Sequence, residues 1–461
     1  MAAKSASPPP AYFLSLSLEN VRSFGEKQTI SFAREDGRPA QWTIILGDNG
    51  VGKTTVLKAL ASVIPSQGVP VIDEKLFSPQ YFATRKSNLR DGWTLNRDGN
   101  SEVAVVESVA IISHILTEDR HIFEDNLLGI ALKSNYGKGK GFTGGSSSVF
   151  SENSLGLICY GYGAGRTIGN STLSETPETV DTCASLFDDR ADLLNPEEWF
   201  LFADYRMVKD KDPLTTQNFN LIRAALLKIM EEGEVTDLEV APVQSNGGSP
   251  RQGVRFKTPY GWVRLRDMSL GYQTLVVWLT DFADKLFVRY PDSKNPLEEP
   301  AIVLIDEIDL HLHPSWQRKL VKTLSEIFVN TQFIATAHSP FVVQAASDSN
   351  ANVVLLKREN DQEIVYQGHR LPDVRRWRIE QILSSELFDD TPPISPQTEA
   401  DLTRRNTLLL KKRLTKAEKE ELARLTAELT GSPVGITRAE RRAESLLAEL
   451  AQNLGENDLL P

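Results

Sequence analysis

The fold is decided by the stretch Gly47-Asp48-Asn49-Gly50-Val51-Gly52-Lys53-Thr54. The short apolar run 42–46 before it is typical of a buried strand, and the apolar-periodic segment 54–64 after it predicts a helix. In this spacing the glycines let backbone N–H groups converge on phosphate oxygens, and the start of the helix favours negative charge. We therefore expect a strand, a phosphate-binding loop and a helix.

Two side chains of the loop have expected roles in binding ATP. Lys53 would reach the β- and γ-phosphates, and the Thr54 hydroxyl would bind Mg²⁺. A surface glycine turn is the alternative, but the fixed positions match by chance in only about one or two per hundred sequences of this length. The nucleotide-binding residues expected here are Gly47, Asp48, Asn49, Gly50, Val51, Gly52, Lys53, Thr54 and Thr55.

A second part of the site is expected where the apolar run 301–305 ends in Asp306 and Glu307. A continuous apolar run is typical of a strand buried on both faces of a parallel sheet. Asp306 would then lie near the magnesium ion, and Glu307 would act as general base on the attacking water. An acidic helix cap is the alternative, and the phosphate loop in the same chain favours the catalytic pair.

Three histidines lie near the expected ends of these strands. His338 closely follows the apolar run 332–336, at the sheet edge where parallel strands carry nucleotide chemistry, so we expect it to sense the γ-phosphate. His311 and His313 have no third metal ligand beside them in the sequence, which favours a structural or interface role over metal binding.

Length and composition restrict the class of protein. The chain has 461 residues, of which 40% are hydrophobic and 25% charged, which fits two or three globular domains. No apolar run is long enough for a membrane span, and two cysteines without paired spacing argue against a disulfide framework and a zinc site. We expect a cytoplasmic protein. The net charge of −11 leaves only a local basic patch for any contact with DNA.

The segment Met268-Ser-Leu-Gly-Tyr-Gln273 precedes the acidic pair and opens a predicted helix. It resembles the L-S-G-G-Q signature of ABC-type ATPases, with Met268, Ser269 and Gly271 in register, whereas Leu270 and Tyr272 depart from the transporter form. The resemblance implies a head-to-tail dimer in which Ser269 and Gly271 act on the phosphate held by a second subunit. It also implies that Asp309 lies in the D-loop at the subunit seam.

Two further parts are expected from this resemblance. The turn Arg22-Ser23-Phe24 resembles one in RecF-like proteins and would supply the adenine platform. No glutamine stands out for the Q-loop.

Longer phrases resemble a narrower family, the ATPase component of bacterial Septu antiphage systems, which also occurs in some retrons. They include Tyr162-Gly-Ala-Gly-Arg166, Asn195-Pro-Glu-Glu-Trp199, the segment 306–316 and the segment 371–377. The resemblance covers most of 12–385. It implies a homodimer or higher homo-oligomer and a separate HNH nuclease controlled by the nucleotide state. A RecF/SMC-like DNA-repair ATPase, and an ATP-gated scaffold with little hydrolysis, stay open as alternatives.

The expected fold class is α/β. It comprises an ABC-type P-loop NTPase core, a long insertion between the phosphate loop and the signature, and a C-terminal helical module. In the module, capping-box patterns at 415–418 and 437–440 predict helix starts. Seven basic residues between 404 and 419 would contact DNA, dock the nuclease or form a solvated helix face. The expected parts are a leader at 1–11, core at 12–65, insertion with helices and flexible loops at 66–252, core at 253–370 and the helical module at 371–461.

Overall fold

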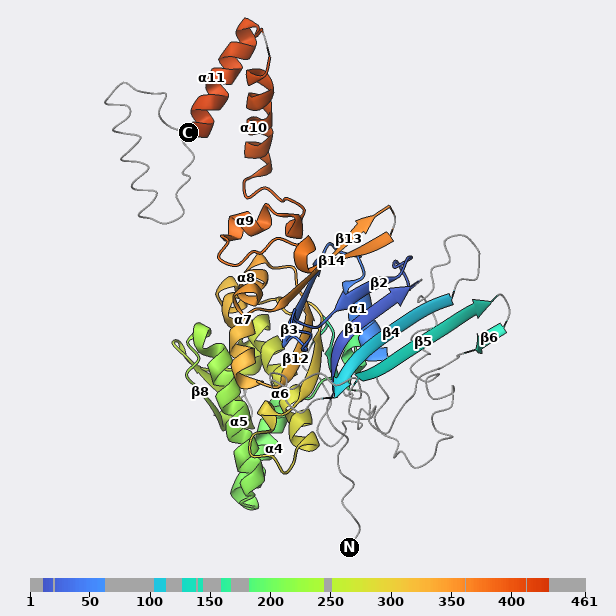
Figure 1. The fold of residues 1–461 in the computed structure, drawn as a ribbon. Helices are drawn as coiled ribbons and strands as arrows, with labels where there is room; N and C mark the ends of the chain where they lie inside the picture. Colours follow the sequence, from blue (N-terminus) through green and yellow to red (C-terminus); the bar gives the residue numbers. More distant parts are fainter. Residues whose placement is uncertain are drawn as a thin grey trace. The chain divides into compact units, whose positions relative to one another are not determined.

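The chain divides into two compact units, residues 1–388 and residues 389–461, and each is described by itself (Figure 1). The elements below come from a computed structural model. It describes residues 11–19, 21–62, 103–112, 127–137, 140–143, 159–166, 182–243, 251–360, 362–411 and 413–430.

The larger unit is built on a six-stranded sheet with the order β14-β13-β3-β12-β11-β7. All neighbours are parallel except β14, which pairs antiparallel with β13. Because β12 lies between β3 and β11, the residues that follow these strands meet at one edge of the sheet. The strands are β3 (Trp42–Gly47), β7 (Cys159–Tyr162), β11 (Ala301–Ile305), β12 (Thr331–Thr336), β13 (Asn352–Glu359) and β14 (Gln362–Gln367).

The two faces of this sheet bury different cores, as the alternation of side chains along a strand requires. In β3, Ile44 belongs to one core and Ile45 to the other, and Val303 and Leu304 of β11 divide in the same way. The first face is covered by α6 (Leu270–Arg289), α7 (Pro314–Ile327) and α8 (Pro340–Asp348). The second is covered by α1 (Lys53–Ser62) with β1 (Ala11–Glu19) and β2 (Gln28–Ser31) (Figure 1). The expected strands buried on both faces are confirmed.

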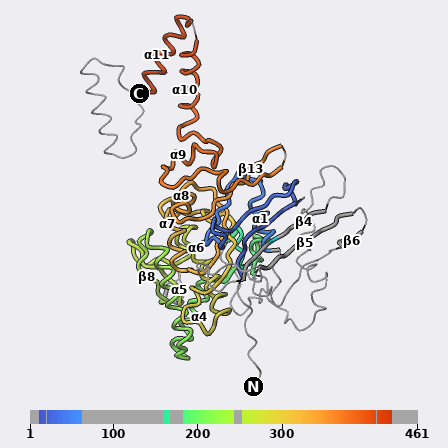
Figure 2. Tube along the Cα trace, viewed as in Figure 1, coloured from blue at the N-terminus to red at the C-terminus, as the bar shows by residue number. Residues whose placement is uncertain are grey.

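A second, antiparallel sheet has the order β2-β1-β4-β5-β6, with β4 (Val103–Ile112), β5 (Leu127–Gly137) and β6 (Lys140–Thr143). Figure 2 shows the blue N-terminal segment beside the orange segment that contains β13. The two are joined at β14, where the Glu363 N–H donates to the Ser23 carbonyl (3.4 Å) and the Val365 N–H donates to Gln28 Oε1 (3.1 Å). These bonds hold the 22–24 turn next to the central sheet.

A helical layer precedes α6 in the chain. It contains α3 (Ala184–Phe187), α4 (Pro196–Lys209), α5 (Pro213–Ile229) and the 3₁₀ turn η4 (Met230–Gly233). The α4 start is as predicted, because Asn195 accepts a hydrogen bond from the Glu197 N–H (3.0 Å) and proline follows the cap. A three-stranded sheet then contains β8 (Asp237–Val243), β9 (Arg251–Thr258) and β10 (Gly261–Arg264), and its β9–β10 pair is the predicted hairpin.

The strand β7 lies within the range 66–252 that the sequence predicts as an insertion, yet it belongs to the core sheet beside β11. With only four residues it has too few positions to show a periodic pattern. Its Tyr162 hydroxyl donates to buried Asp281 of α6 (2.8 Å), and Lys285 pairs with the same carboxylate (2.6 Å). The strand is therefore fixed to the sheet on one side and to α6 on the other.

The short elements complete the larger unit. They are η5 (Leu265–Asp267), η6 (Pro296–Glu298), η7 (Gly368–Arg370), α9 (Ile379–Leu383) and η8 (Glu386–Phe388). Val374, Ile382 and Leu387 are buried in the same core as α6–α8. Residues 371–388, which the sequence predicts as part of the helical module, thus pack with the core of the larger unit.

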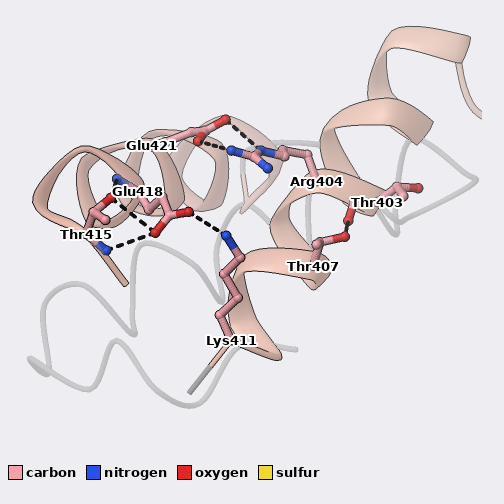
Figure 3. Close-up of polar contacts among 7 residues, drawn as sticks. All are labelled: Thr403, Arg404, Thr407, Lys411, Thr415, Glu418 and Glu421. Carbon is pink, nitrogen blue, oxygen red and sulfur yellow. Dashed lines mark hydrogen bonds and ion pairs between the residues drawn. The ribbon is translucent and has the colours of Figure 1, made fainter. Parts of the chain in front are cut away.

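The smaller unit contains α10 (Pro396–Leu409) and α11 (Lys416–Thr430), which pack against each other. The predicted capping box is present: the Glu418 N–H donates to Thr415 Oγ1 (3.3 Å), and the Thr415 N–H donates to Glu418 Oε2 (2.9 Å). Figure 3 shows two ion pairs that join the helices, Arg404 with Glu421 (2.8 Å) and Lys411 with Glu418 (2.6 Å). The second predicted box, at 437–440, lies outside the described residues.

Candidate nucleotide site

The phosphate-binding loop runs from the end of β3 to the start of α1. Gly47, Gly50 and Gly52 have φ angles of 138°, 86° and 88°, which side chains other than glycine rarely adopt. A β-carbon on Gly47 would lie 2.4 Å from the Leu356 carbonyl oxygen, and one on Gly52 would lie 2.8 Å from the Phe24 ring. The loop is therefore packed tightly on both sides, and its course depends on glycine at these positions.

Lys53 places a positive charge on this loop. Its Nζ donates to the carbonyl oxygens of Gly47 and Asp48, both at 2.7 Å, and only 7% of the residue is exposed. Burial lowers the pKa of the ammonium group, while the nearby Asp306 carboxylate acts in the opposite direction. A buried cation in a glycine loop at the start of a helix is suited to bind phosphate oxygens.

Asp306 joins the two predicted halves of the site. Its Oδ2 accepts a hydrogen bond from the Thr54 hydroxyl (2.7 Å), and its Oδ1 accepts one from the Thr336 hydroxyl (2.6 Å). A carboxylate and a hydroxyl side by side are ligands that Mg²⁺ takes in nucleotide sites, together with phosphate oxygens and water. The residues predicted as magnesium ligands, although 252 positions apart, are in direct contact.

Glu307 follows at the same sheet edge in an unusual backbone conformation. Its φ is 49°, in the left-handed region that non-glycine residues seldom adopt and that clusters at functional sites. The Thr336 hydroxyl accepts a hydrogen bond from its N–H (2.7 Å), and its carbonyl oxygen accepts one from Arg166 Nη2 (2.8 Å). In the part of the chain that the structure describes, no hydrogen bond occupies its carboxylate, which leaves this group free to act on water.

His338 lies at this edge as well. Its side chain is exposed, and its backbone N–H donates to Asp309 Oδ2 (3.0 Å). Gln317 connects the same loops, since its Nε2 donates to the Asp309 carbonyl (3.2 Å) and its Oε1 accepts from the Ser339 hydroxyl (2.5 Å). The loop that contains Asp309 and the segment 338–339 are therefore held together.

The signature residues occupy the start of α6. Ser269 is the exposed N-cap residue, and its side chain makes no capping hydrogen bond. Gly271 is buried, and a β-carbon there would lie 2.4 Å from the His311 carbonyl oxygen, so the close packing requires glycine. The structure thus packs the start of α6 against the loop that contains His311 and leaves Ser269 exposed.

Two other predicted features have structural explanations. His313 caps α7, since its Nδ1 accepts from the Ser315 N–H (3.3 Å), and the described residues contain no group of three or more side chains arranged for a metal ion. The Phe24 ring is fully buried and packs on Gly52, so the prediction of an adenine platform at 22–24 is wrong for this ring. Arg22 and Ser23 are the accessible part of that turn.

Arg166 is a residue to which the sequence analysis gave no role. It lies in the loop that follows β7, and its contact with Glu307 joins positions 141 apart in the chain. The phrase Tyr162-Gly-Ala-Gly-Arg166 was the available signal. Its glycines allow close packing, since a β-carbon on Gly163 would lie 2.2 Å from the Ser185 carbonyl oxygen.

Comparisons with known proteins show which proteins this chain resembles. Two family models match the chain, "AAA domain" over residues 15–109 and "AAA domain, putative AbiEii toxin, Type IV TA system" over residues 184–344. Septu protein PtuA of Bacillus mycoides is 26% identical over 90% of this chain and 50% of its own length. The protein named "Retron Ec83 probable ATPase" of Escherichia coli is 47% identical over 29% of this chain and 23% of its own length.

This chain therefore spans about half the length of the Septu relative. Among solved structures, an SMC head bound to the C-winged helix domain of ScpA aligns with a TM-score of 0.41 and 15% identity, over 77% of this chain and 97% of that one. The predicted resemblance to Septu and retron ATPases is confirmed, and so is the α/β P-loop fold. None of the described helices combines the length and the apolar character needed to cross a membrane.

Proposed function

We propose that this chain, an ABC-type ATPase similar to the Septu and retron proteins, binds ATP with Mg²⁺ and hydrolyses it at the edge of its central sheet. The observation that carries the proposal is the contact of Asp306 with both Thr54 and Thr336. It brings a phosphate loop, a carboxylate suited to magnesium and a free neighbouring carboxylate into one place.

In this mechanism the residues mainly position the nucleotide and the attacking water and neutralise negative charge on the phosphates. Lys53 and the loop amides bind the β- and γ-phosphates, while Thr54 and Asp306 hold the magnesium ion. When bound, that ion neutralises charge on the phosphate oxygens. Glu307 accepts a proton from the attacking water, and His338 contacts the γ-phosphate from the next strand.

The active unit in this proposal is a head-to-tail homodimer. Ser269 is exposed at the positive end of α6 without a capping partner, which supports a role toward the phosphate of a second copy. Gly271 sets the close approach of this helix to the 309–311 loop, so that both would lie at the same seam. Each nucleotide would then be sandwiched between the loop of one copy and the signature of the other.

The wider role we propose is control of a partner HNH nuclease in antiphage defence. The similarity to a Septu protein over 90% of this chain supports it. A RecF/SMC-like DNA-repair ATPase is the alternative, and a direct DNA contact would need free basic groups. Arg404 and Lys411 are engaged in ion pairs within the helical hairpin, which favours a structural role for this part of the basic run (Figure 3).

Turnover measurements test the proposed site. Glu307→Gln should retain ATP binding and lower hydrolysis by at least about 100-fold, because the general base is lost. Lys53→Ala should lose ATP binding itself, because its phosphate contact is removed. Steady-state hydrolysis and equilibrium binding of ATP measure the two effects, with exposed Glu298→Gln as the matched control. Wild-type turnover in Glu307→Gln would refute the assignment, and tight ATP binding without turnover in the unaltered chain would favour a scaffold.

A further inference from the structure

Arg166 is a buried cation at the edge of the nucleotide site. Only 4% of the residue is exposed. Burial lowers the pKa of its guanidinium to about 10, while Asp306, Glu307 and Asp309 act in the opposite direction. The group therefore stays charged at neutral pH, next to the carboxylates that the proposed reaction uses.

The hydrogen-bonding capacity of this guanidinium is only partly used. Nη2 donates to the Glu307 carbonyl (2.8 Å). Nε and Nη1 are buried, and neither has a hydrogen-bond partner among the residues that the structure describes. Buried polar groups are nearly always paired, and donors on a charged group are the most costly to leave unpaired. Two such donors on a cation next to the proposed magnesium ligand Asp306 and the proposed base Glu307 indicate a ligand with acceptor oxygens.

The fold explains why the arginine stands here. β7 is parallel to β11, and the Asp306 N–H donates to the Tyr162 carbonyl (2.8 Å), so the loop after β7 emerges beside the acidic pair. Gly163 and Gly165 let this loop lie directly on the Ser185–Asp189 backbone. A bulkier loop would lift Arg166 away from Glu307.

We infer that Arg166 binds the γ-phosphate of ATP through its two free donors and thereby makes the site distinguish ATP from ADP. This inference rests on the proposed ATP site. It gives the loop after β7 a specific task and links that loop to the general base, because the same guanidinium holds the Glu307 peptide. A purely structural arginine would brace Glu307 and have no effect on the choice of nucleotide.

The test measures the affinities of the full-length protein for ADP and for a non-hydrolysable ATP analogue, both with Mg²⁺. Arg166→Gln should weaken binding of the analogue by at least about 10- to 100-fold, because charge-assisted hydrogen bonds to the γ-phosphate are lost, and change ADP affinity by less than about threefold. Arg166→Lys should lie between, since it keeps the charge and loses the planar fork. Arg223→Gln is the control, because Arg223, like Arg166, donates to a backbone carbonyl, here that of Leu238, and lies away from the site.

Equal losses for both nucleotides, or no loss for either, would overturn the inference and leave the ATP site intact. Lower turnover with an unchanged ratio of the two affinities would do the same, and would make Arg166 a brace for Glu307. If the unaltered chain binds neither nucleotide, the proposed function itself fails. If the melting temperature shows that Arg166→Gln does not fold while the Arg223 control does, Arg166→Lys is used instead. Its ratio of affinities for the ATP analogue and for ADP then tests the inference.

Discussion

Thr336 is the residue on which the geometry of the acidic pair depends. It is fully buried at the end of β12, where its hydroxyl donates to Asp306 Oδ1 and accepts from the Glu307 N–H. One hydroxyl thus fixes the carboxylate proposed to hold magnesium and the peptide of the proposed base. The strand order makes this possible, because β12 runs between β3 and β11.

Thr336→Val should therefore damage both stability and catalysis. Valine has a similar shape but leaves the Glu307 N–H and Asp306 Oδ1 without that partner, which costs about 1–3 kcal/mol of unfolding free energy. Turnover should fall by at least about tenfold, since both groups lose their orientation. Denaturant unfolding and steady-state ATP hydrolysis measure the two quantities. Thr336→Ser keeps the hydroxyl and is the control; if it behaves like the valine variant, the hydroxyl is not the cause.

The sequence was sufficient for residues whose role lies in a contiguous pattern. The loop 47–54 and the pair Asp306–Glu307 each carry their own context of strand and turn, so their meeting at one edge could be predicted. Arg166 and Thr336 could not, because their roles depend on which strands are neighbours. A pattern within one strand does not state that β7 lies beside β11.

At the scale of elements, β7 and α6 form one buried connection. The Tyr162 hydroxyl and Lys285 both donate hydrogen bonds to the Asp281 carboxylate. Burial is the main cause that raises the pKa of Tyr162, and the nearby Asp281 carboxylate raises it further, so the hydroxyl keeps its proton and stays a donor. The same strand leads into Arg166, and the same helix begins at the signature Ser269. Through this connection Arg166, proposed for the chain's own ATP site, and Ser269, proposed for the site of a partner copy, are attached to the same buried support.

The helical hairpin of the smaller unit offers a prediction on pH. The hydrogen bond from Lys411, then those from Thr415, lower the pKa of Glu418 from 4.5 to about 2. A carboxylate whose pKa is lower in the folded than in the unfolded state stabilises the fold at pH values above its unfolded-state pKa. This stabilisation is lost as the pH falls through its folded-state pKa. The contribution of Glu418 should thus be complete above pH 4.5 and disappear toward pH 2.

Glu418→Gln isolates this effect, because glutamine keeps a capping-box acceptor and removes only the charge. The unaltered and variant full-length chains should differ in helical circular dichroism by a constant amount near neutral pH. This difference should decrease to zero as the pH falls from 4.5 to about 2. Glu428→Gln, which loses an ion pair within α11 alone, is the control. A difference that persists at pH 2 would show that charge at Glu418 does not stabilise the hairpin.

For the whole molecule, the central claim is that two copies share each ATP site. One chain provides the phosphate loop, the acidic pair and Arg166, and it leaves Ser269 exposed at the start of α6. In a head-to-tail pair, Ser269→Arg damages only the site whose loop belongs to the partner, whereas Lys53→Ala damages only the variant's own loop.

Mixing these two inactive variants is the most direct test. In a mixed dimer one site combines the intact loop of the Ser269→Arg copy with the intact signature of the Lys53→Ala copy, and the other site carries both changes. Random pairing makes about half of the dimers mixed, so ATP turnover should recover to about a quarter of the unaltered rate. Each variant alone should stay near zero. No recovery, with mixed dimers demonstrated by differently tagged copies, would contradict shared sites.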